Sequence, residues 1–244
     1  MRPPAVRGAV AAVLLLAGAL SLSSCSGASD PQSGAASSPS TSSAAPAGLT
    51  ATGLTAAQIK AALPRVAELP KGWKVDPTST LTGNMTLKDS DTVTPASCTP
   101  AGQVQQNFNF VAPADAHGSV DFVGGAHGLF SGVTVYSFDA PYPASALAAI
   151  RASVAKCPTY QETEDDGTLV TDQVALIPTP SMGEESLGLE VSSVYQGTRL
   201  DLVTVLARSG NTLVAVEDAG AGTPASAARA EKLVRATLAR LPHP

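Results

Sequence analysis

The sequence predicts an α+β fold in which an antiparallel β-sheet of about six to seven strands packs against two to three helices. Short runs of alternating apolar and polar residues recur, turn residues join them as hairpins, and few stretches show helical spacing. The helices are expected to cover one side of the sheet. This folded part is expected to span residues 54–244, after a signal peptide (1–24) and a disordered tether (25–53).

The first 24 residues are typical of a secretory leader. Arg2 and Arg7 form a positive region, and residues 9–20 form an apolar run. That run is shorter than the roughly 20 residues that a membrane-spanning helix needs. Residues 22–25, Leu-Ser-Ser-Cys, match the lipobox of bacterial lipoproteins, in which diacylglycerol alkylates the cysteine thiol. We therefore expect lipidation of Cys25 and anchoring at the extracytoplasmic face of the plasma membrane. The alternative is an ordinary secretory signal with an incidental cysteine.

The segment after Cys25 has a low-complexity composition. Residues 26–53 are mostly Ser, Ala, Gly, Pro and Thr, which bury too little apolar area to offset their ordering entropy. They are expected to be a tether.

The net charge is −5, and it becomes about −7 when removal of the leader takes away two arginines and no acid. Nucleic acid is not an expected partner, because phosphate binding needs a surplus of Lys and Arg.

The first predicted helix begins after Leu54. Thr55 and Gln58 form a capping box, and Pro64 limits or kinks the helix. The segment Leu-Pro-Lys-Gly-Trp at 69–73 then predicts a turn that places the only tryptophan, Trp73, at the start of an extended segment. Residues 76–107 are polar and irregular, with a possible short strand at 85–88.

The central part of the chain predicts two strands and a second helix. Strands are expected at 120–123 and 133–138. Gly124-Gly125 between them is interpreted as a bulge that bends the strand, because no lysine follows to make a phosphate loop. Pro143 suits the first turn of a helix that runs to residue 156.

The C-terminal part predicts a meander and a last helix. Asp166-Gly167 is a hairpin turn between strands at 159–164 and 169–177. Further strands are expected at 187–191, 200–207 and 213–217, and 200–207 has the continuous apolar pattern of a strand covered on both faces. Thr223-Pro224 is expected to cap the last helix. Its inward residues are expected to be Ala230, Leu233, Val234, Thr237 and Leu241. Its water-facing residues are expected to be Arg229, Glu231, Lys232 and Arg235.

If Cys25 carries lipid, Cys98 and Cys157 are the remaining cysteines. Outside the membrane the compartment permits disulfides, and a single pair has one possible connectivity. The alternative is two buried free thiols.

Several of these motifs occur in a recognisable order. They are the lipobox, the tether, the Leu-Pro-x-Gly-Trp turn, an Ala-rich helix ending in Cys157-Pro158, residues 182–186 (Met-Gly-Glu-Glu-Ser) before an alternating strand, and a closing helix. Over residues 54–241 the combination resembles actinobacterial lipoproteins with a PknH-like extracellular sensor domain. The resemblance implies an antiparallel sheet with packed helices, a ligand cleft, and a family disulfide at Cys98 and Cys157. Members with kinase domains have two such bridges, whereas this chain has cysteines for one. A second resemblance, to small mycobacterial-type lipoproteins with a PsbP-like α/β/α sandwich, implies a similar outline.

No combination of residues predicts catalysis, a metal or a cofactor. His117, His127 and His243 lack the spacing of a zinc site, and no Gly-x-Ser-x-Gly motif is present. The acidic run of Glu162, Glu164, Asp165 and Asp166 is interpreted as a solvated turn, because it lacks the ligand pattern of a calcium loop. The aromatic residues expected to line a cleft, if they are not core packing, are Trp73, Tyr136, Phe138 and Tyr195.

We therefore expect a ligand-binding or sensor-like domain that is not an enzyme. Its expected partners are the plasma membrane, through the lipid, and an unknown small ligand or envelope protein. The first alternative is a structural or protein-interaction module of the cell envelope, and an envelope hydrolase comes third.

Overall fold

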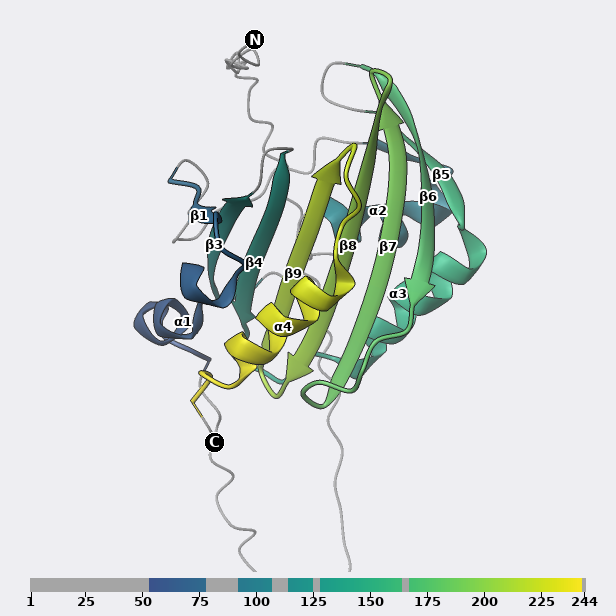
Figure 1. Cartoon of the computed structure of the whole chain (residues 1–244). Coiled ribbons are helices and arrows are strands. Elements are labelled where there is room, and N and C mark those ends of the chain that lie inside the picture. The colour runs from purple at the N-terminus through teal and green to yellow at the C-terminus, as the bar shows by residue number, and fades with distance from the viewer. Residues whose placement is uncertain (1–52, 78–91, 107–113, 125–127, 164–166, 243–244) are drawn as a thin grey trace, which may run out of the picture. The chain divides into compact units, whose positions relative to one another are not determined.

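In a computed structural model, nine strands of the described residues form one open antiparallel sheet in the order β1-β3-β4-β9-β8-β7-β6-β5-β2 (Figure 1). The structure describes residues 53–77, 92–106, 114–124, 128–163 and 167–242, so the predicted leader, Cys25, the tether up to residue 52 and the possible strand at 85–88 lie outside it. The strands are β1 (Lys74–Val75), β2 (Thr92–Thr94), β3 (Ala116–Gly124), β4 (Leu129–Ser137), β5 (Thr159–Thr163), β6 (Leu169–Ile177), β7 (Glu185–Tyr195), β8 (Thr198–Ser209) and β9 (Thr212–Ala221). The helices are α1 (Ala56–Ala62), α2 (Thr99–Gln106), α3 (Ala144–Lys156) and α4 (Ala227–Leu238), with short 3-10 turns at Val66–Glu68 and Ala96–Cys98.

Helices cover both faces of the sheet, and strand β9 shows why. Side chains alternate across a strand: Leu213 and Ala215 belong to one hydrophobic core, whereas Val214 and Val216 belong to the other. The first core contains residues of α2 and α3, and its side of the sheet is called the α3 face. The second contains residues of α1 and α4, and its side is the α4 face (Figure 1). The expectation that helices cover only one side is therefore wrong.

The first helix begins and ends as predicted. The Thr55 side chain accepts a hydrogen bond from the Gln58 backbone N–H, and the Gln58 side chain accepts one from the Thr55 N–H at 2.8 Å. This capping box satisfies two N–H groups that have no partner within the helix. The helix ends at Ala62, because Pro64 cannot continue it. Its buried residue Ile59 contributes to the α4-face core.

The antiparallel character of the sheet is confirmed, but the expected number of strands was too low. The two additional strands are the sheet edges, β1 and β2, which have only two and three residues. Such short strands show no useful periodicity. Helix α2 was also not predicted, because its sequence, TPAGQVQQ, is polar and contains glycine. In the structure this helix contacts α3, and its residue Ala101 is buried.

The structure shows no bulge at Gly124, and Gly125, the other half of the predicted bulge, lies outside the described residues. β3 and β4 pair without interruption from Ala116↔Ser137 to Gly124↔Leu129. A Cβ atom on Gly124 would overlap the indole ring of Trp73, which packs against that position. Gly124 is therefore required by a close side-chain contact and not by a bend in the strand.

The predicted hairpin and central strand are confirmed. β5 and β6 pair from Thr159↔Gln173 to Thr163↔Leu169, and Gly167 at the turn has a φ of +81°. β8 lies near the middle of the sheet, and Val205 and Leu206 are fully buried on its two faces. Among the described residues, no helix is long and apolar enough to cross a bilayer.

The last helix differs from its prediction in two respects. Its N-cap is Ser226, whose side chain accepts a hydrogen bond from the Arg229 N–H, and not Thr223-Pro224. Arg229 was expected to face water, but its side chain is only 15% exposed and contacts the fully buried Asp218. The predicted inward residues are all buried: Ala230, Leu233, Val234, Thr237 and Leu241.

Candidate ligand-binding pocket

A pocket of about 330 Å³ on the sheet combines carboxyl groups with apolar walls, and we call it the acid pocket. Its polar lining residues are Glu162 of β5, Asp172 of β6, Ser193 of β7 and Asp201 of β8. Its apolar lining includes Val191, Leu200, Leu202 and Ala219. The described lining residues belong to strands, apart from Gly128 in the turn before β4, so the sheet forms most of this concavity. Its volume lies at the lower end of the range for small-molecule sites, roughly 300–1,000 Å³.

Strand alternation places the two buried carboxyl groups on the α3 face. Asp172 lies between Val170 and Val174, which are both 4% exposed, while Thr171 and Gln173 are exposed. Residues two positions apart in a strand point to the same face, so a residue midway between two inward residues of this spacing also faces inward. On β5, Glu162 follows the buried Tyr160 at the same period. Asp172 is 3% exposed and Glu162 is 7% exposed. The expectation that Glu162 belongs to a solvated turn is therefore wrong, and Glu164 to Asp166 lie outside the described residues.

The Asp172 carboxyl group is incompletely hydrogen-bonded. Its side chain shares hydrogen bonds with Glu162 and Ser193, but its Oδ2 atom has no partner in the structure. Burial raises the pKa of Asp172, because removing a carboxylate from water disfavours its charged form. The hydrogen bonds to Glu162 and Ser193 oppose this rise without cancelling it. A buried carboxyl oxygen without a partner, on the wall of a pocket, is a position where a donor group on a ligand would be stabilised.

The acid pocket has no basic lining residue among those that the structure describes. Asp201 is paired with Arg199, whose Nε lies 2.9 Å from the carboxylate, and the Arg199 side chain is 63% exposed. Arg199 itself does not line the pocket. Among the described lining residues, Asp172 therefore has no cationic partner.

A second pair of carboxyl groups lies further along the α3 face. Asp121 of β3 and Glu217 of β9 both pair in register with Gly132 of β4, so they flank this glycine. A Cβ atom at position 132 would lie 2.8 Å from Asp121 Oδ1, so the glycine leaves room for the carboxylate. Burial, together with the nearby charge of Asp121, raises the pKa of Glu217 to about 8.

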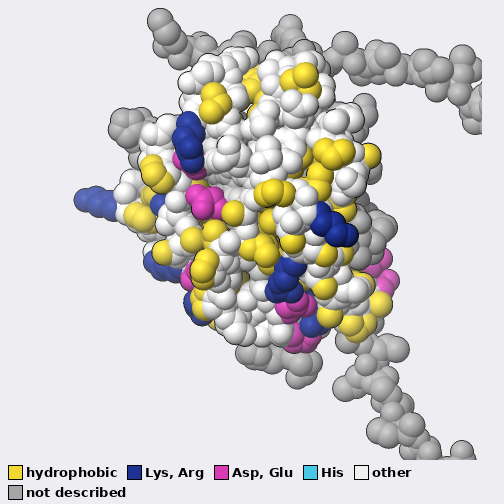
Figure 2. Space-filling view, turned by 90° about the vertical axis from the view of Figure 1, so that its right-hand side faces the viewer, with side chains coloured by type: hydrophobic (Ala, Val, Ile, Leu, Met, Phe, Trp, Pro, Cys, Tyr) yellow, Lys and Arg dark blue, Asp and Glu magenta, His cyan; other side chains and the backbone are white. Residues whose placement is uncertain are grey.

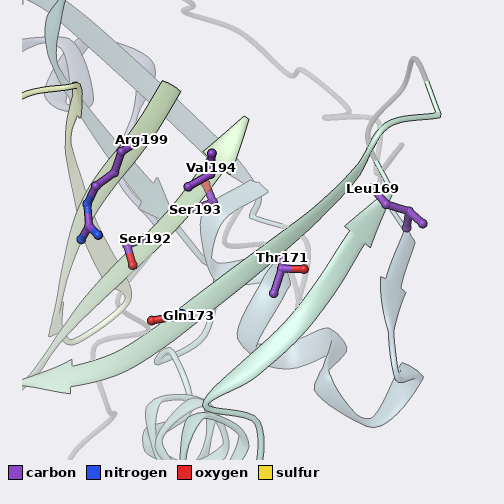
Figure 3. A pocket seen from close by; sticks show the side chains of 7 residues that line it. All are labelled: Leu169, Thr171, Gln173, Ser192, Ser193, Val194 and Arg199. Carbon is purple, nitrogen blue, oxygen red and sulfur yellow. The ribbon is translucent and has the colours of Figure 1, made fainter. Parts of the chain in front are cut away.

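The α4 face carries a separate groove of about 410 Å³ (Figure 3). It is lined by Leu169, Thr171 and Gln173 of β6, Ser192, Ser193 and Val194 of β7, and Arg199 of β8, and Ser193 also lines the acid pocket. Leu169 is 65% exposed and Val194 is 61% exposed, so this part of the sheet is open to solvent. The groove contains no buried carboxyl group and is a less specific candidate for a small ligand.

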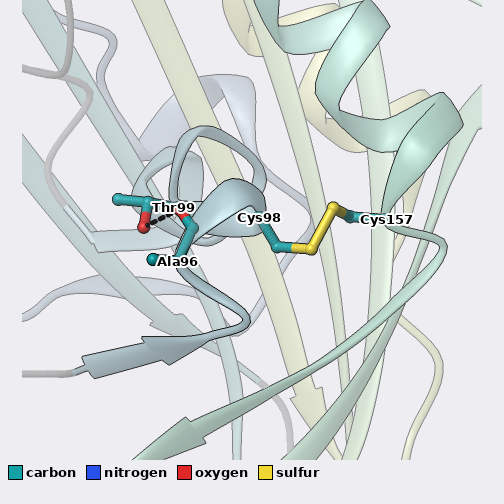
Figure 4. Close-up of a disulfide and its surroundings, with 4 residues drawn as sticks. All are labelled: Ala96, Cys98, Thr99 and Cys157. Atoms are coloured by element: carbon teal, nitrogen blue, oxygen red, sulfur yellow. Dashed lines mark hydrogen bonds between the residues drawn. A yellow bond between two sulfur atoms is a disulfide. The ribbon is translucent and has the colours of Figure 1, made fainter.

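Cys98 and Cys157 form a disulfide that joins two distant parts of the chain (Figure 4). Cys98 ends the 3-10 turn before α2, and Cys157 caps the C-terminus of α3. Both sulfur-bearing residues are at most 4% exposed and belong to the α3-face core. The bond holds α2 and the edge strand β2 against α3, and β2 pairs with β5, the strand that carries Glu162.

The four aromatic residues expected to line a cleft are not brought together. Trp73 lies in the α4-face core, whereas Tyr136 and Phe138 lie in the α3-face core. Tyr195 ends β7 and is half-buried, and its hydroxyl accepts a hydrogen bond from Gln196 at 3.1 Å. None of the four lines the acid pocket or the α4-face groove. Packing against opposite sides of one sheet separates Trp73 from the tyrosine and phenylalanine.

The histidines do not form a site that the structure describes. His117 of β3 lies beside Tyr136 with ring centroids 6.0 Å apart, and burial lowers the pKa of His117. His127 and His243 lie outside the described residues. Within the described part of the chain, no three His, Cys, Asp or Glu side chains are grouped so that they could hold a metal ion.

The acids of the segment 182–186 make structural ion pairs. Glu184 pairs with Arg208 of β8 and accepts a hydrogen bond from the Gly210 N–H at 2.9 Å. Glu185, the first residue of β7, pairs with Arg151 of α3. These contacts tie the start of β7 to its neighbours, so this segment supports the fold and contributes nothing to the acid pocket.

Figure 2 shows the molecule from the side that is on the right in Figure 1. Hydrophobic side chains on this face occur in small groups among polar ones, and charged side chains lie between them. This face of the described residues therefore lacks the large continuous apolar patch that is typical of a protein-docking surface.

Comparison with solved structures identifies the fold. No protein-family model and no curated protein sequence matches the chain. The extracellular domain of PknH from Mycobacterium tuberculosis superposes with a TM-score of 0.56 at 11% identity, over 78% of this chain and 97% of that domain. The chain has the fold of the PknH extracellular domain. A putative uncharacterized protein (Rv0999 ortholog) from Mycobacterium smegmatis also aligns, at 18% identity with a TM-score of 0.44, over 76% of this chain and 94% of that one.

Asp172 and Ser193 were not predicted as site residues, and Glu162 was predicted to lie in a solvated turn. The information was present for Asp172, because its place between Val170 and Val174 in an alternating strand predicts an inward side chain. The same alternation links Glu162 to Tyr160. The predicted hairpin of β5 and β6 already places Glu162 near Asp172, whereas the position of Ser193 beside Asp172 depends on the pairing of β6 with β7.

Proposed function

We propose that this chain is a ligand-binding, sensor-like domain, anchored by a lipid on Cys25 to the extracytoplasmic face of a bacterial plasma membrane. The observation that carries the binding function is Asp172: its carboxyl group is buried on the wall of a pocket and one of its oxygens has no partner. The residues of the pocket bind and orient a ligand, and we expect no covalent chemistry there.

Three observations support the extracytoplasmic location. The lipobox at 22–25 follows a short apolar leader segment. The disulfide between Cys98 and Cys157 is of a kind that persists in oxidising compartments and is rare in the cytosol. The fold is that of a domain described as extracellular. Together these observations favour a surface-displayed domain held off the bilayer by residues 26–53.

The anchor is tested by the intact mass of the chain recovered from a bacterial membrane fraction. The expected product begins at Cys25 and carries the mass of diacylglycerol, with or without an additional acyl chain. Cys25→Ala should abolish the lipid mass and release the protein from the membrane. Recovery of a chain with its leader still attached and no lipid would refute the anchor.

Ligand binding is tested by native mass spectrometry and thermal-shift measurements against envelope lipids and glycans. A binding ligand raises the unfolding temperature, because it stabilises only the folded state. The expected result is a concentration-dependent shift that is reduced in Asp172→Asn. The absence of any shift across envelope compounds and small amines would contradict a binding function.

A protein-interaction module is the second candidate, and the α4-face groove favours it. Leu169 and Val194 line this groove and are both more than half exposed. Cross-linking in intact cells would show a partner on this groove. Loss of that cross-link in Leu169→Asp but not in Asp172→Asn would support this second function.

A further inference from the structure

We propose that the acid pocket binds an uncharged aliphatic alcohol, whose hydroxyl group donates a hydrogen bond to Oδ2 of Asp172 and whose carbon chain lies against the apolar residues beside it. The inference rests on the proposed ligand-binding function and names the chemical class that the same pocket would take. Three properties of the described lining carry it: its state of charge, its unpartnered acceptor and its apolar walls.

The wall that carries Asp172 is acidic but does not require a cation. Asp172 shares one hydrogen bond with the Glu162 carboxyl group and another with Ser193. Two carboxylates repel each other, so a hydrogen bond between two carboxyl groups requires a proton on one of them. Asp201, the remaining acid of the described lining, is paired with Arg199. An uncharged ligand fits this wall and avoids the desolvation penalty of burying an ion.

One oxygen atom of the lining needs a donor. Among the described buried side-chain atoms that lack a hydrogen-bond partner, only Asp172 Oδ2 belongs to a residue that lines the pocket. Asp172 is 3% exposed, and Glu162 has an interaction of its own and is not a free group. A hydroxyl group carries one O–H donor, which matches one acceptor. An ammonium group carries three N–H donors, and a donor left without an acceptor in a buried site costs free energy.

The walls beside Asp172 are apolar and suit a short carbon chain. Val191 belongs to the α3-face core, and Leu202 packs against that core. Leu200, two positions before Leu202 on the same strand, is 37% exposed. A carbon chain placed on these three lining residues removes apolar surface of both molecules from water. A volume of about 330 Å³ accommodates a small molecule and not a large lipid.

The same properties disfavour two other classes of envelope compound. A carbohydrate carries a hydroxyl group on most of its carbon atoms, and apolar walls would leave many of these groups without the hydrogen bonds that water supplies. A fatty-acid anion would bring a further negative charge to a wall that already contains carboxyl groups. An alcohol with one hydroxyl group at the end of a carbon chain has neither disadvantage.

The test is a nuclear magnetic resonance titration of the full chain, as cells make it, with 1-pentanol at pH 7. The free concentration of each probe is measured in every sample. 1-Methoxybutane is the matched analogue, because it is an isomer of 1-pentanol that has no O–H donor. n-Pentylamine and pentanoate supply the cation and the anion.

1-Pentanol should shift the resonances of Asp172, Val191 and Leu202, with a Kd in about the millimolar range, as suits a ligand of this size. 1-Methoxybutane, pentylamine and pentanoate should each bind at least about tenfold more weakly, because they leave a donor or acceptor unpaired or bury a charge. 1-Propanol, which is two methylene groups shorter, should also bind about tenfold more weakly than 1-pentanol.

Asp172→Val is the diagnostic variant, since valine suits a strand and its side chain has no hydrogen-bond acceptor. It should weaken 1-pentanol binding about tenfold and remove the preference for 1-pentanol over 1-methoxybutane. Glu190→Gln is the matched control and should leave the affinity unchanged, since Glu190 is an exposed carboxylate on β7 outside the described lining. Unfolding curves verify that both variants are folded. If Asp172→Val is not folded, the comparison of 1-pentanol with 1-methoxybutane on the parent protein decides.

Each outcome has a defined consequence. Binding of 1-methoxybutane, pentylamine or pentanoate as tightly as 1-pentanol would overturn the proposal, and so would an unchanged 1-pentanol affinity in folded Asp172→Val. Failure of 1-pentanol to bind, with a thermal shift from another envelope compound, would overturn the alcohol and leave the binding function intact. Failure of every compound would overturn both.

Discussion

The guanidinium of Arg229 donates to both carboxylate oxygens of Asp218, with Nε 2.5 Å from Oδ2 and Nη2 2.6 Å from Oδ1. Asp218 also accepts hydrogen bonds from the Ser131 hydroxyl and, at 2.7 Å, from the Ser226 backbone N–H. The guanidinium lies 4.6 Å from the centroid of the Trp73 ring. A fully buried charge is thereby satisfied by groups from β4, α4 and the loop before α4, so the pair joins the last helix to the sheet.

Arg229→Ala should destabilise the protein by about 3 kcal/mol, because it leaves the Asp218 carboxylate buried without its cation. The free energy of unfolding, measured in urea, checks this. Arg235→Ala is the control on the same helix, since its side chain is 53% exposed and its pair with Glu231 lies at the surface. A surface pair contributes less than about 1 kcal/mol. Equal losses in the two variants would contradict the structural role of Asp218 and Arg229.

Gly124→Ala should destabilise the protein by about 1–3 kcal/mol, because the added methyl group would overlap the Trp73 ring. A double-mutant cycle with Trp73→Ala checks the cause. In that background the additional loss from Gly124→Ala should largely disappear, because the overlapping ring is gone. If the loss is the same in both backgrounds, Gly124 is needed for a reason other than this contact.

Replacing both disulfide cysteines, as Cys98→Ala with Cys157→Ala, should lower the free energy of unfolding by about 4 kcal/mol. The two residues are separated by 59 positions. Closing a loop of this length with a disulfide lowers the conformational entropy of the unfolded chain and so stabilises the folded state. Urea unfolding with and without a reducing agent is the measurement. The reducing agent should destabilise the parent protein and have no effect on the double variant.

The stability of the protein should fall as the pH rises from about 5 to 9. The folded-state pKa of Glu217 is raised to about 8 by burial and by Asp121. The folded state therefore favours protonated Glu217, and its stabilisation, complete below the ordinary carboxyl pKa, is lost as the pH rises through about 8. The raised pKa of Asp172, also caused by burial, acts in the same direction.

Glu217→Gln removes one of these titrations and should make the free energy of unfolding depend less on pH. Above pH 8 the variant should be more stable than the parent by at least about 1 kcal/mol, since an amide needs no ionisation. Urea unfolding at intervals of one pH unit checks this, with Glu190→Gln as the exposed control. Stability of the parent that rises with pH over this range would contradict the raised pKa.

Local patterns were predicted well where one short segment contained all the necessary information. Thr55 and Gln58 form the expected capping box because both partners lie within one helical turn. The β5–β6 hairpin and the buried strand β8 were predicted from turn residues and an apolar run. The edge strand β2 was missed, and β1 was predicted only as an extended segment after Trp73, because two or three residues form a strand only when a neighbour supplies hydrogen bonds.

The candidate site was less predictable, because its residues are charged. Glu162 was assigned to a solvated turn, and Arg229 to the surface of its helix, on the general preference of charged side chains for water. In the structure each has a partner from another strand or helix: Glu162 meets Asp172, and Arg229 meets Asp218. Each partner lies only ten or eleven positions away along the chain, but residue type alone does not show that the fold brings the two groups together out of water.

The sequence by itself predicted the leader and the lipobox, which lie outside the described residues. It also determined the antiparallel character of the sheet and the inward faces of the last helix and the central strand. These features depend on residue type and on spacing along the chain. The tertiary structure decided that helices cover both faces, that Trp73 lies opposite Tyr136 and Phe138, and that Glu162, Asp172 and Ser193 share one pocket wall. The physical reason is that these relationships depend on which strands are neighbours, and local hydrophobic periodicity contains no information on strand order.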